Sequence, residues 1–349
     1  MTNFLRYSVL AAVACAIPAA AVAQVYPERM AVRVRGSAEA YQHRDRQDNR
    51  AQQVERTTRT IHIGDSGTLD LGNIAGDITI TPGRRGDAMV EIVKTAHART
   101  DADAKNMLSL VTVDVNETGS HGEVRAKYHN DGGGWHMFGG NINVSVDYTV
   151  TAPAGTRVTA ESISGDIRVT GIADVSAGTV SGDVKVSGAK RLGSIKSISG
   201  SVEISDADLD GSIESQSVSG DVTLRRVKAR RVEASSVSGN LLLDGVDCDR
   251  VGAHTTSGEI TFNGPLARDG RYELKGFSGD VRVGVAGNTG FELQASSFSG
   301  EVRSDLPITT RGTSDSRRGR RTTLAGTYGD GSAVLQVTTF SGSIIISKR

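Results

Sequence analysis

One segment of the chain concentrates side chains that could contact a ligand. Residues 129–140 contain Trp135, which is the only tryptophan, together with His129, Asp131, His136 and five glycines. An exposed tryptophan flanked by polar groups can stack on a sugar ring or enter a pocket of a partner protein. We therefore name Trp135 and His136 as candidate ligand contacts. The alternative is a loop that folds Trp135 back over the open end of a sheet. Two histidines seven residues apart on a glycine-rich loop match no known metal-ligand spacing, so we expect no metal there.

A second segment concentrates positive charge. Residues 311–321 contain five arginines and one acid. Guanidinium groups bind phosphate and carboxylate groups, so Arg317, Arg318, Arg320 and Arg321 are candidate contacts for lipopolysaccharide or another anionic polymer. The alternative is a solvated loop without a ligand. Because Lys plus Arg and Asp plus Glu are 40 each in the whole chain, we expect no nucleic-acid partner.

Other residues with reactive side chains are better explained by structure. The acid after many Ser-Gly pairs occurs once in about 20 residues, whereas calcium-binding β-rolls need a nine-residue repeat. Cys248 lies among apolar residues and is expected to be buried. Some parallel β-helices are polysaccharide lyases or hydrolases, which need carboxylates clustered on one outer face. In this chain the acids of the repeat occur once per coil, at the corners. We therefore expect no catalytic residues and no cofactor. An enzyme acting on envelope or matrix polysaccharide is the alternative.

The elements that must position these segments form a repeat. A Ser-Gly pair followed by a polar residue and then Ile, Val or Leu occurs nine times, and successive glycines are 17, 18, 20, 19, 19, 21, 21 and 42 residues apart. A period near 20 predicts stacked coils, with strands about 4.8 Å apart and a glycine at each corner where a Cβ would clash. We predict an all-β fold, a β-solenoid or parallel β-helix-like stack. The alternative is an antiparallel sandwich with a hairpin at each Ser-Gly pair. The glycines are Gly165, Gly182, Gly200, Gly220, Gly239, Gly258, Gly279, Gly300 and Gly342.

The repeat carries three further expectations. Apolar residues two places before, two after and four after the glycine are expected to fill the core, with Phe277, Phe298 and Phe340 as an aromatic ladder inside the last coils. The hydroxyl groups and the residue after the glycine are expected to hydrogen-bond the local backbone at the corner. Residues 344–346 are expected to be an open edge strand, where Lys348 and Arg349 limit self-association.

The N-terminal residues predict export. Residues 1–23 carry Arg6, an apolar run and a final Ala-Val-Ala, which is typical of a cleaved signal peptide. Acylation of Cys15 is the alternative. We favour cleavage, because the residue three places before Cys15 is not a large aliphatic one. We expect membrane association only if Cys15 is acylated. Cleavage would leave Cys248 alone and exclude a disulfide framework. We expect a periplasmic, secreted or surface location.

The rest of the chain divides by its pattern. Residues 24–56 are polar and predict a flexible linker. Residues 57–349 predict one β domain, with irregular strands over 57–150 and regular repeats over 151–349. Acids and helix formers at 101–108 predict one short helix in the irregular part.

The repeats also resemble a known family. Thr-Leu-Asp-Leu at residues 68–71, Gly-Asp-Ile-Thr-Ile at 76–80, Val-Asp-Tyr-Thr-Val-Thr-Ala-Pro at 146–153 and the repeated Ser-Val-Ser-Gly-Asp-Val motif are similar to the DUF4097 family of uncharacterised bacterial proteins, described as "putative adhesins". The resemblance covers about residues 57–349. It implies a β-solenoid-like fold, an extracytoplasmic setting and no established enzymatic activity. The implied function is a non-enzymatic, adhesin-like binding scaffold for an envelope, glycan or protein ligand.

Overall fold

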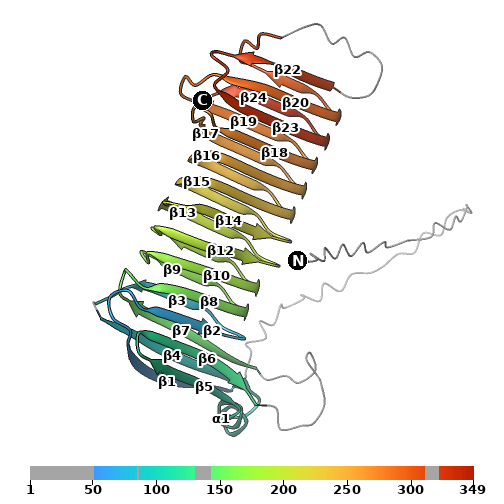
Figure 1. The fold of residues 1–349 in the computed structure, drawn as a ribbon. Helices are drawn as coiled ribbons and strands as arrows, with labels where there is room; N and C mark the ends of the chain where they lie inside the picture. The colour runs from blue at the N-terminus through green and yellow to red at the C-terminus, as the bar shows by residue number, and fades with distance from the viewer. Residues whose placement is uncertain (1–50, 85, 130–142, 311–321) are drawn as a thin grey trace, which may run out of the picture. The chain divides into compact units, whose positions relative to one another are not determined.

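Each coil of the protein contributes two strands, one before its Ser-Gly pair and one after it. The computed structural model describes residues 51–84, 86–129, 143–310 and 322–349, and Figure 1 shows the fold. The strands before the Ser-Gly pairs form what we call the first face, and those after the pairs form the second face. The described residues of the first face include β2 (Thr68–Gly72), β8 (Arg157–Ser164), β10 (Asp174–Ser181), β12 (Arg191–Ser197), β14 (Ser212–Ser217), β18 (Arg271–Ser278), β20 (Phe291–Ser299) and β23 (Ala333–Ser341).

The second face follows the same order along the stack. It includes β3 (Ile78–Pro82), β9 (Ile167–Thr170), β11 (Val184–Ser187), β13 (Val202–Asp208), β17 (Ile260–Pro265), β19 (Val281–Ala286), β21 (Val302–Ser304) and β24 (Ile344–Lys348). The long strands β15 (Val222–Ser238) and β16 (Leu241–Ser257) begin on the second face and end on the first.

Neighbouring coils pair in parallel and place like residues on like. On the second face Val202 is aligned with Val222, and Val222 with Leu241. These residues are fully buried, as are most residues two and four places after the glycines. The parallel register confirms the stacked coils and excludes the antiparallel sandwich.

The glycine corners depend on close contact between coils. A Cβ at Gly220 would lie 2.2 Å from the carbonyl oxygen of Gly200, and equivalent contacts of 2.0–2.2 Å recur at the other Ser-Gly glycines. We expected the corner side chains to bond within one turn, but they join neighbouring coils instead. Ser217 Oγ donates to Gly200 O at 2.8 Å, and Asp221 Oδ1 accepts from the backbone N–H of Asn240 at 2.7 Å.

The order of the last coils in space differs from their order in the chain. β23 lies between β18 and β20, and β24 lies between β19 and β21. The prediction of an open edge at residues 344–346 is therefore wrong. Lys348 Nζ donates to Asn288 Oδ1 at 3.4 Å, and Arg349 pairs with Asp244 at 2.5 Å. The N-terminal end repeats the arrangement, because β2 lies between β6 and β8 and β3 between β7 and β9.

Antiparallel strands cover both ends of the described stack. They are β1 (Ala51–His62), β4 (Asp87–Ala98) and β5 (Val111–Thr118) at one end and β22 (Thr322–Tyr328) at the other; β6 (His121–Tyr128) and β7 (Val144–Ala152) pair in parallel with β2 and β3. Since β1 starts at Ala51, residues 51–56 belong to a strand and not to the expected linker; residues 1–50 lie outside the described part.

The short helix was predicted correctly. α1 spans Asp101–Ser109 and is capped by Thr100, whose Oγ1 accepts from the backbone N–H of Asp103 at 3.1 Å. Among the described residues, no helix has the length and apolar character needed to cross a membrane.

Candidate functional surface on the first face

A column of large apolar side chains runs along the outside of the first face, next to the Ser-Gly corner. We call this column the apolar ladder. Each member lies two places before a corner glycine, and the exposed fractions range from 37% to 55%. In spatial order the ladder is Ile74, Ile163, Val180, Ile198, Val218, Val237, Phe277, Phe340 and Phe298, with Thr256 between Val237 and Phe277.

The strand register makes the ladder continuous. The backbone N–H of Ser199 donates to Val180 O, that of Ser219 to Ile198 O, and that of Ser238 to Val218 O, each at 2.8 Å. The rings of Phe277 and Phe340 stack with centroids 4.9 Å apart, and those of Phe340 and Phe298 stack at 4.7 Å.

The sequence predicted the aromatic ladder but placed it on the wrong side. The three phenylalanines do stack, yet they lie outside the coil and not in the core. The side chain that points inward is the hydroxyl residue one place earlier, such as Ser217 or Ser236. The hydroxyls of Ser217 and Ser236 each donate to a glycine carbonyl of the neighbouring coil, which offsets the cost of burial, whereas the equivalent Ser162 Oγ is buried without a hydrogen-bond partner.

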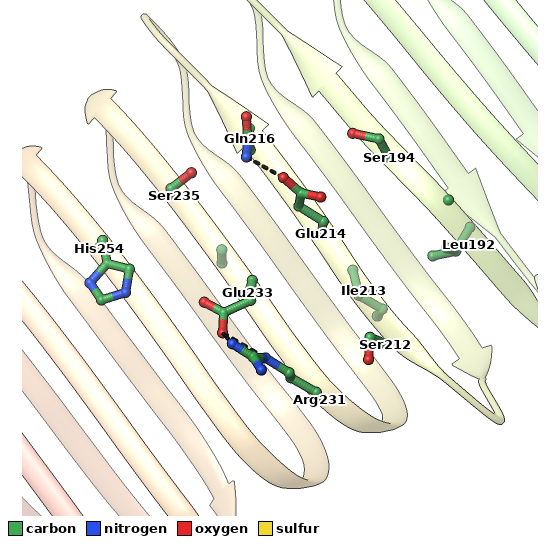
Figure 2. Close-up of a pocket in the computed structure, with 12 residues that line it drawn as sticks. Leu192, Ser194, Ser212, Ile213, Glu214, Gln216, Arg231, Glu233, Ser235 and His254 are labelled. Carbon is green, nitrogen blue, oxygen red and sulfur yellow. Dashed lines mark hydrogen bonds and ion pairs between the residues drawn. The ribbon is translucent and has the colours of Figure 1, made fainter. Parts of the chain in front are cut away.

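A polar groove of about 730 Å³ lies beside the ladder and crosses β12, β14, β15 and β16 (Figure 2). Gln216 Nε2 donates to Glu214 Oε1 at 2.6 Å, and Arg231 Nε donates to Glu233 Oε1 at 2.9 Å. Ser235 and His254 are aligned with Gln216 on the neighbouring strands, and all three are closer to the ladder in the sequence than Glu214, Arg231 and Glu233.

Two glycines lie under side chains of neighbouring strands at the groove: Gly193 lines it, and Gly252 lies beside Glu233, which also lines it. Gly252 is aligned with Glu233 on the neighbouring strand, and a Cβ at Gly252 would lie 2.1 Å from Glu233 Oε2. A Cβ at Gly193 would likewise lie 2.2 Å from Ser176 Oγ. The two glycines therefore let neighbouring side chains lie flat across the strands and keep the surface hollow.

Smaller hollows connect the ladder with the polar groups along the face. One is bordered by Ile74 and Ile163 together with Arg125 and Glu161. A second is bordered by Phe277, His254 and Lys275. The first face therefore offers an apolar stripe on the corner side and polar groups beside it.

The charged groups beside the groove are engaged in local ion pairs. Glu233 pairs with Arg231, and Glu273 pairs with Lys275. The hydrogen bond from Lys275 is the main cause that lowers the pKa of Glu273 below its usual value. These groups can offer hydrogen bonds to a polar ligand from fixed positions. No cluster of three or more His, Cys, Asp or Glu side chains able to hold a metal occurs in the described ranges.

The structure does not test the side chains named from the sequence as candidate ligand contacts. Trp135, His136, Arg317, Arg318, Arg320 and Arg321 all lie outside the described residues, as does Cys15.

The residues expected to have structural roles do have them. Cys248 is buried, and burial raises the pKa of its thiol to about 12. The corner acids Asp166, Asp183 and Asp221 each accept a backbone N–H of the next coil through Oδ1.

Sequence reasoning missed the surface itself. The signal was present as a Ser or Thr three places before most corner glycines, followed at once by a large apolar residue. Within one strand, adjacent side chains point to opposite sides, so only one of the two can face the core.

A protein-family model matches most of the chain. The model of the Toastrack DUF4097 family matches residues 67–347, whereas no curated protein matches the chain. A "putative lipid binding protein" from Parabacteroides distasonis is 13% identical, covering 84% of this chain and 97% of its own, with a TM-score of 0.48.

Two further solved structures are similarly distant in sequence. A "putative adhesin" from Bacteroides fragilis is 14% identical over 84% of this chain and 97% of its own, with a TM-score of 0.39. A "putative cell adhesion protein" from Clostridium sporogenes is 11% identical over 85% and 100%, with a TM-score of 0.22. Because the family model spans most of the sequence and its repeats form the observed coils, the chain belongs to the Toastrack DUF4097 family.

Proposed function

We propose that the protein is an exported, non-enzymatic binding scaffold that holds an envelope glycan or protein on its first face in an adhesin-like manner. The observation that carries the proposal is the groove of Glu214, Gln216, Arg231, Glu233 and His254 beside the apolar ladder. Protein sites for saccharides and peptides combine an apolar surface with a few fixed hydrogen-bonding groups. The coil stack repeats both kinds of surface along its length.

The carboxylates of the first face and of the corners are engaged in hydrogen bonds and ion pairs, which supports binding over glycoside hydrolysis. Hydrolysis requires two carboxyl groups about 5–10 Å apart that are free to act as acid and as base or nucleophile. In the groove, Glu214 is hydrogen-bonded to Gln216 and Glu233 is paired with Arg231. At the corners the aspartates hold neighbouring coils together.

We extend the proposal to the two segments outside the described residues and to the location. Trp135 and His136 would contact the same ligand, and Arg317, Arg318, Arg320 and Arg321 would contact its anionic groups. Export would follow cleavage after residue 23. Mass spectrometry of the protein isolated from its native envelope tests this step, and a mature N-terminus other than Gln24 would contradict it.

The test of the binding surface uses a matched pair of substitutions on β15. Ser235→Trp fills the groove, whereas Thr223→Trp adds the same side chain to the outside of the second face. On an array of envelope polysaccharides we expect the wild type and Thr223→Trp to bind, and Ser235→Trp to lose binding. Equal binding by all three proteins would contradict the proposed site. Release of reducing sugar from a bound glycan would favour the enzyme instead.

A further inference from the structure

The apolar ladder exposes more apolar surface than a soluble monomer normally carries in one patch. Nine Ile, Val and Phe side chains leave about half of their surface to solvent. At roughly 150–200 Å² for each side chain, this amounts to on the order of 700 Å². The largest apolar patch on a typical monomer is about 300–600 Å², and each partner of a stable protein pair buries about 800 Å². The ladder and its immediate border are therefore large enough for a specific protein interface.

The spacing of the ladder restricts the kind of partner. The phenylalanine rings are 4.7 and 4.9 Å apart, which is the spacing of neighbouring β-strands. An α-helix laid along the ladder presents a turn every 5.4 Å, and an extended strand presents side chains on one side about every 6.8 Å. A helix would shift by about 0.6 Å per coil relative to the ladder and an extended strand by about 2 Å, so over ten coils either partner would be out of register with the ladder by about 6 Å or more. A second stack of β-coils has the same spacing and stays in register.

The two borders of the ladder differ in the charged residues they carry. Several of these groups also have an ion-pair partner within the chain: Asp166 with Arg168, Asp280 with Arg282 and Lys275 with Glu273. On the corner side, each ladder residue except Ile74 is followed by an exposed serine, and the residue after the corner glycine is an acid in most coils, among them Asp166, Asp183, Asp221 and Asp280. On the opposite side lie Lys196 and Lys275, two places before ladder residues of their own coils. Asp77, Glu259 and Glu301 are further acids on the corner side, and Glu161 is an acid on the lysine side.

This asymmetry selects one orientation of two copies. When two ladders meet with their stack axes parallel, about a twofold axis along the stack, the corner border of one copy faces the lysine border of the other. Lys275 would then lie opposite the partner copy's Asp280, since both belong to the same coil. With antiparallel axes, each border would face its own kind. Electrostatic complementarity therefore favours the parallel arrangement.

We propose that two copies of the chain associate side by side through the apolar ladder, with parallel stack axes and with like coils facing each other. Every ladder residue then meets its own counterpart, aliphatic on aliphatic in most of the stack and aromatic on aromatic near β18, β23 and β20. The interface leaves the strand edges unused and borders the groove of the proposed function, because Gln216, Ser235 and His254 lie two places before ladder positions.

The first experiment measures the association of the mature protein by analytical ultracentrifugation. The test variant replaces Phe277, Phe298 and Phe340 by threonine, which the chain itself carries in the ladder at Thr256. We expect a wild-type dimer whose dissociation constant rises about a hundredfold in the variant, as hot-spot losses of about 2.7 kcal/mol imply.

The control is the double variant Val54→Thr and Met89→Thr, which removes equally exposed apolar side chains away from the ladder. It should remain dimeric. A monomeric wild type, or equal weakening in test and control, would overturn the proposal. Circular dichroism checks that each variant is folded.

The second experiment tests the orientation with single cysteines under an oxidant. Cys248 is buried, so the wild type serves as the uncrosslinked control. In the parallel arrangement Ile163→Cys, far from the middle of the ladder, and Val237→Cys, near the middle, both form disulfide-linked dimers. Crosslinking of Val237→Cys alone would overturn the parallel interface, because an antiparallel pair brings only central residues together. Flotation of the wild type, but not of the triple variant, with phospholipid vesicles would assign the ladder to lipid and overturn the proposal as well.

Discussion

Replacement of Gly220 by alanine isolates the contact on which coil stacking depends. The backbone of Gly220 is not in the left-handed region, so alanine incurs no dihedral strain there. The added Cβ would lie 2.2 Å from Gly200 O and 3.0 Å from Ser201 N. Ordinary contacts of a Cβ begin above 3.0 Å, so the corner between these coils must open by about 1 Å.

The cost follows from the hydrogen bonds that hold this corner closed. They are Ser217 Oγ to Gly200 O at 2.8 Å, Ser219 N–H to Ile198 O at 2.8 Å, and Val202 N–H to Asp221 O at 2.9 Å. A net contribution of about 0.5–1.5 kcal/mol each gives a loss of about 2–4 kcal/mol in the free energy of unfolding. The loss is concentrated at one junction between coils, so cooperativity along the stack should also decrease.

Urea unfolding followed by circular dichroism measures the change, with hydrogen exchange to locate it. We expect Gly220→Ala to lower the midpoint and to weaken amide protection first in β13, β14 and β15. Gly178→Ala is the matched control, because nothing lies within 4 Å of its Cβ. Alanine there should be neutral or stabilise by up to about 1 kcal/mol. If Gly220→Ala and Gly178→Ala unfold at the same urea concentration, the close-contact argument for the corners is refuted.

Three further predictions concern buried polar groups. Gly276→Ser supplies the hydroxyl that this coil lacks, at the position from which Thr255 donates to Gly239 O in the preceding coil. It should raise the thermal midpoint by the equivalent of about 1–2 kcal/mol, since the nearest atom to its Cβ is 3.5 Å away. Tyr272→Phe removes an acceptor from Ala267 N–H and a donor to Cys248 O, both at 2.7 Å, and should cost about 2–4 kcal/mol in urea unfolding; a loss below about 0.5 kcal/mol would contradict the assignment. Because burial raises the pKa of Cys248 to about 12, its thiol stays protonated at pH 8 and should react with Ellman's reagent only after denaturation; rapid reaction of the native protein would show that the coil opens.

The coil stack could be predicted because the Ser-Gly pair and the apolar residues after it recur with a nearly constant period. The Ser-Gly pair marks a corner where a side chain cannot fit, and the columns two and four places after it fill the core, as Val222 and Leu224 show. The short helix could be predicted from its acids and its cap. These features are local in the sequence, so the period and the residue types determine them.

The ladder could not be predicted from hydrophobicity alone. Val218 and Val222 are both apolar and four residues apart, so alternation along one strand would put them on the same side. The corner at Ser219 and Gly220 lies between them and ends that alternation. Ser217 then turns inward because Gly200 O accepts its hydroxyl, and Val218 turns outward. The choice depends on an acceptor in another coil, which no local pattern contains.

The spatial order of the final coils could not be predicted either, because it also depends on contacts between coils. Val281 of β19, Ile344 of β24 and Val302 of β21 are equivalent in the repeat, so the chain contains no residue that fixes which of them are neighbours. The return of the last coil into the stack leaves β20 and β21 at the end, where β22 pairs antiparallel to β20 and β21 has only three residues. A parallel coil of another copy would therefore find a short edge on one face and an antiparallel strand on the other, and both disfavour end-to-end growth. Since β1, β4 and β5 close the opposite end in the same way, association of copies is directed to the side of the stack, where the apolar ladder lies.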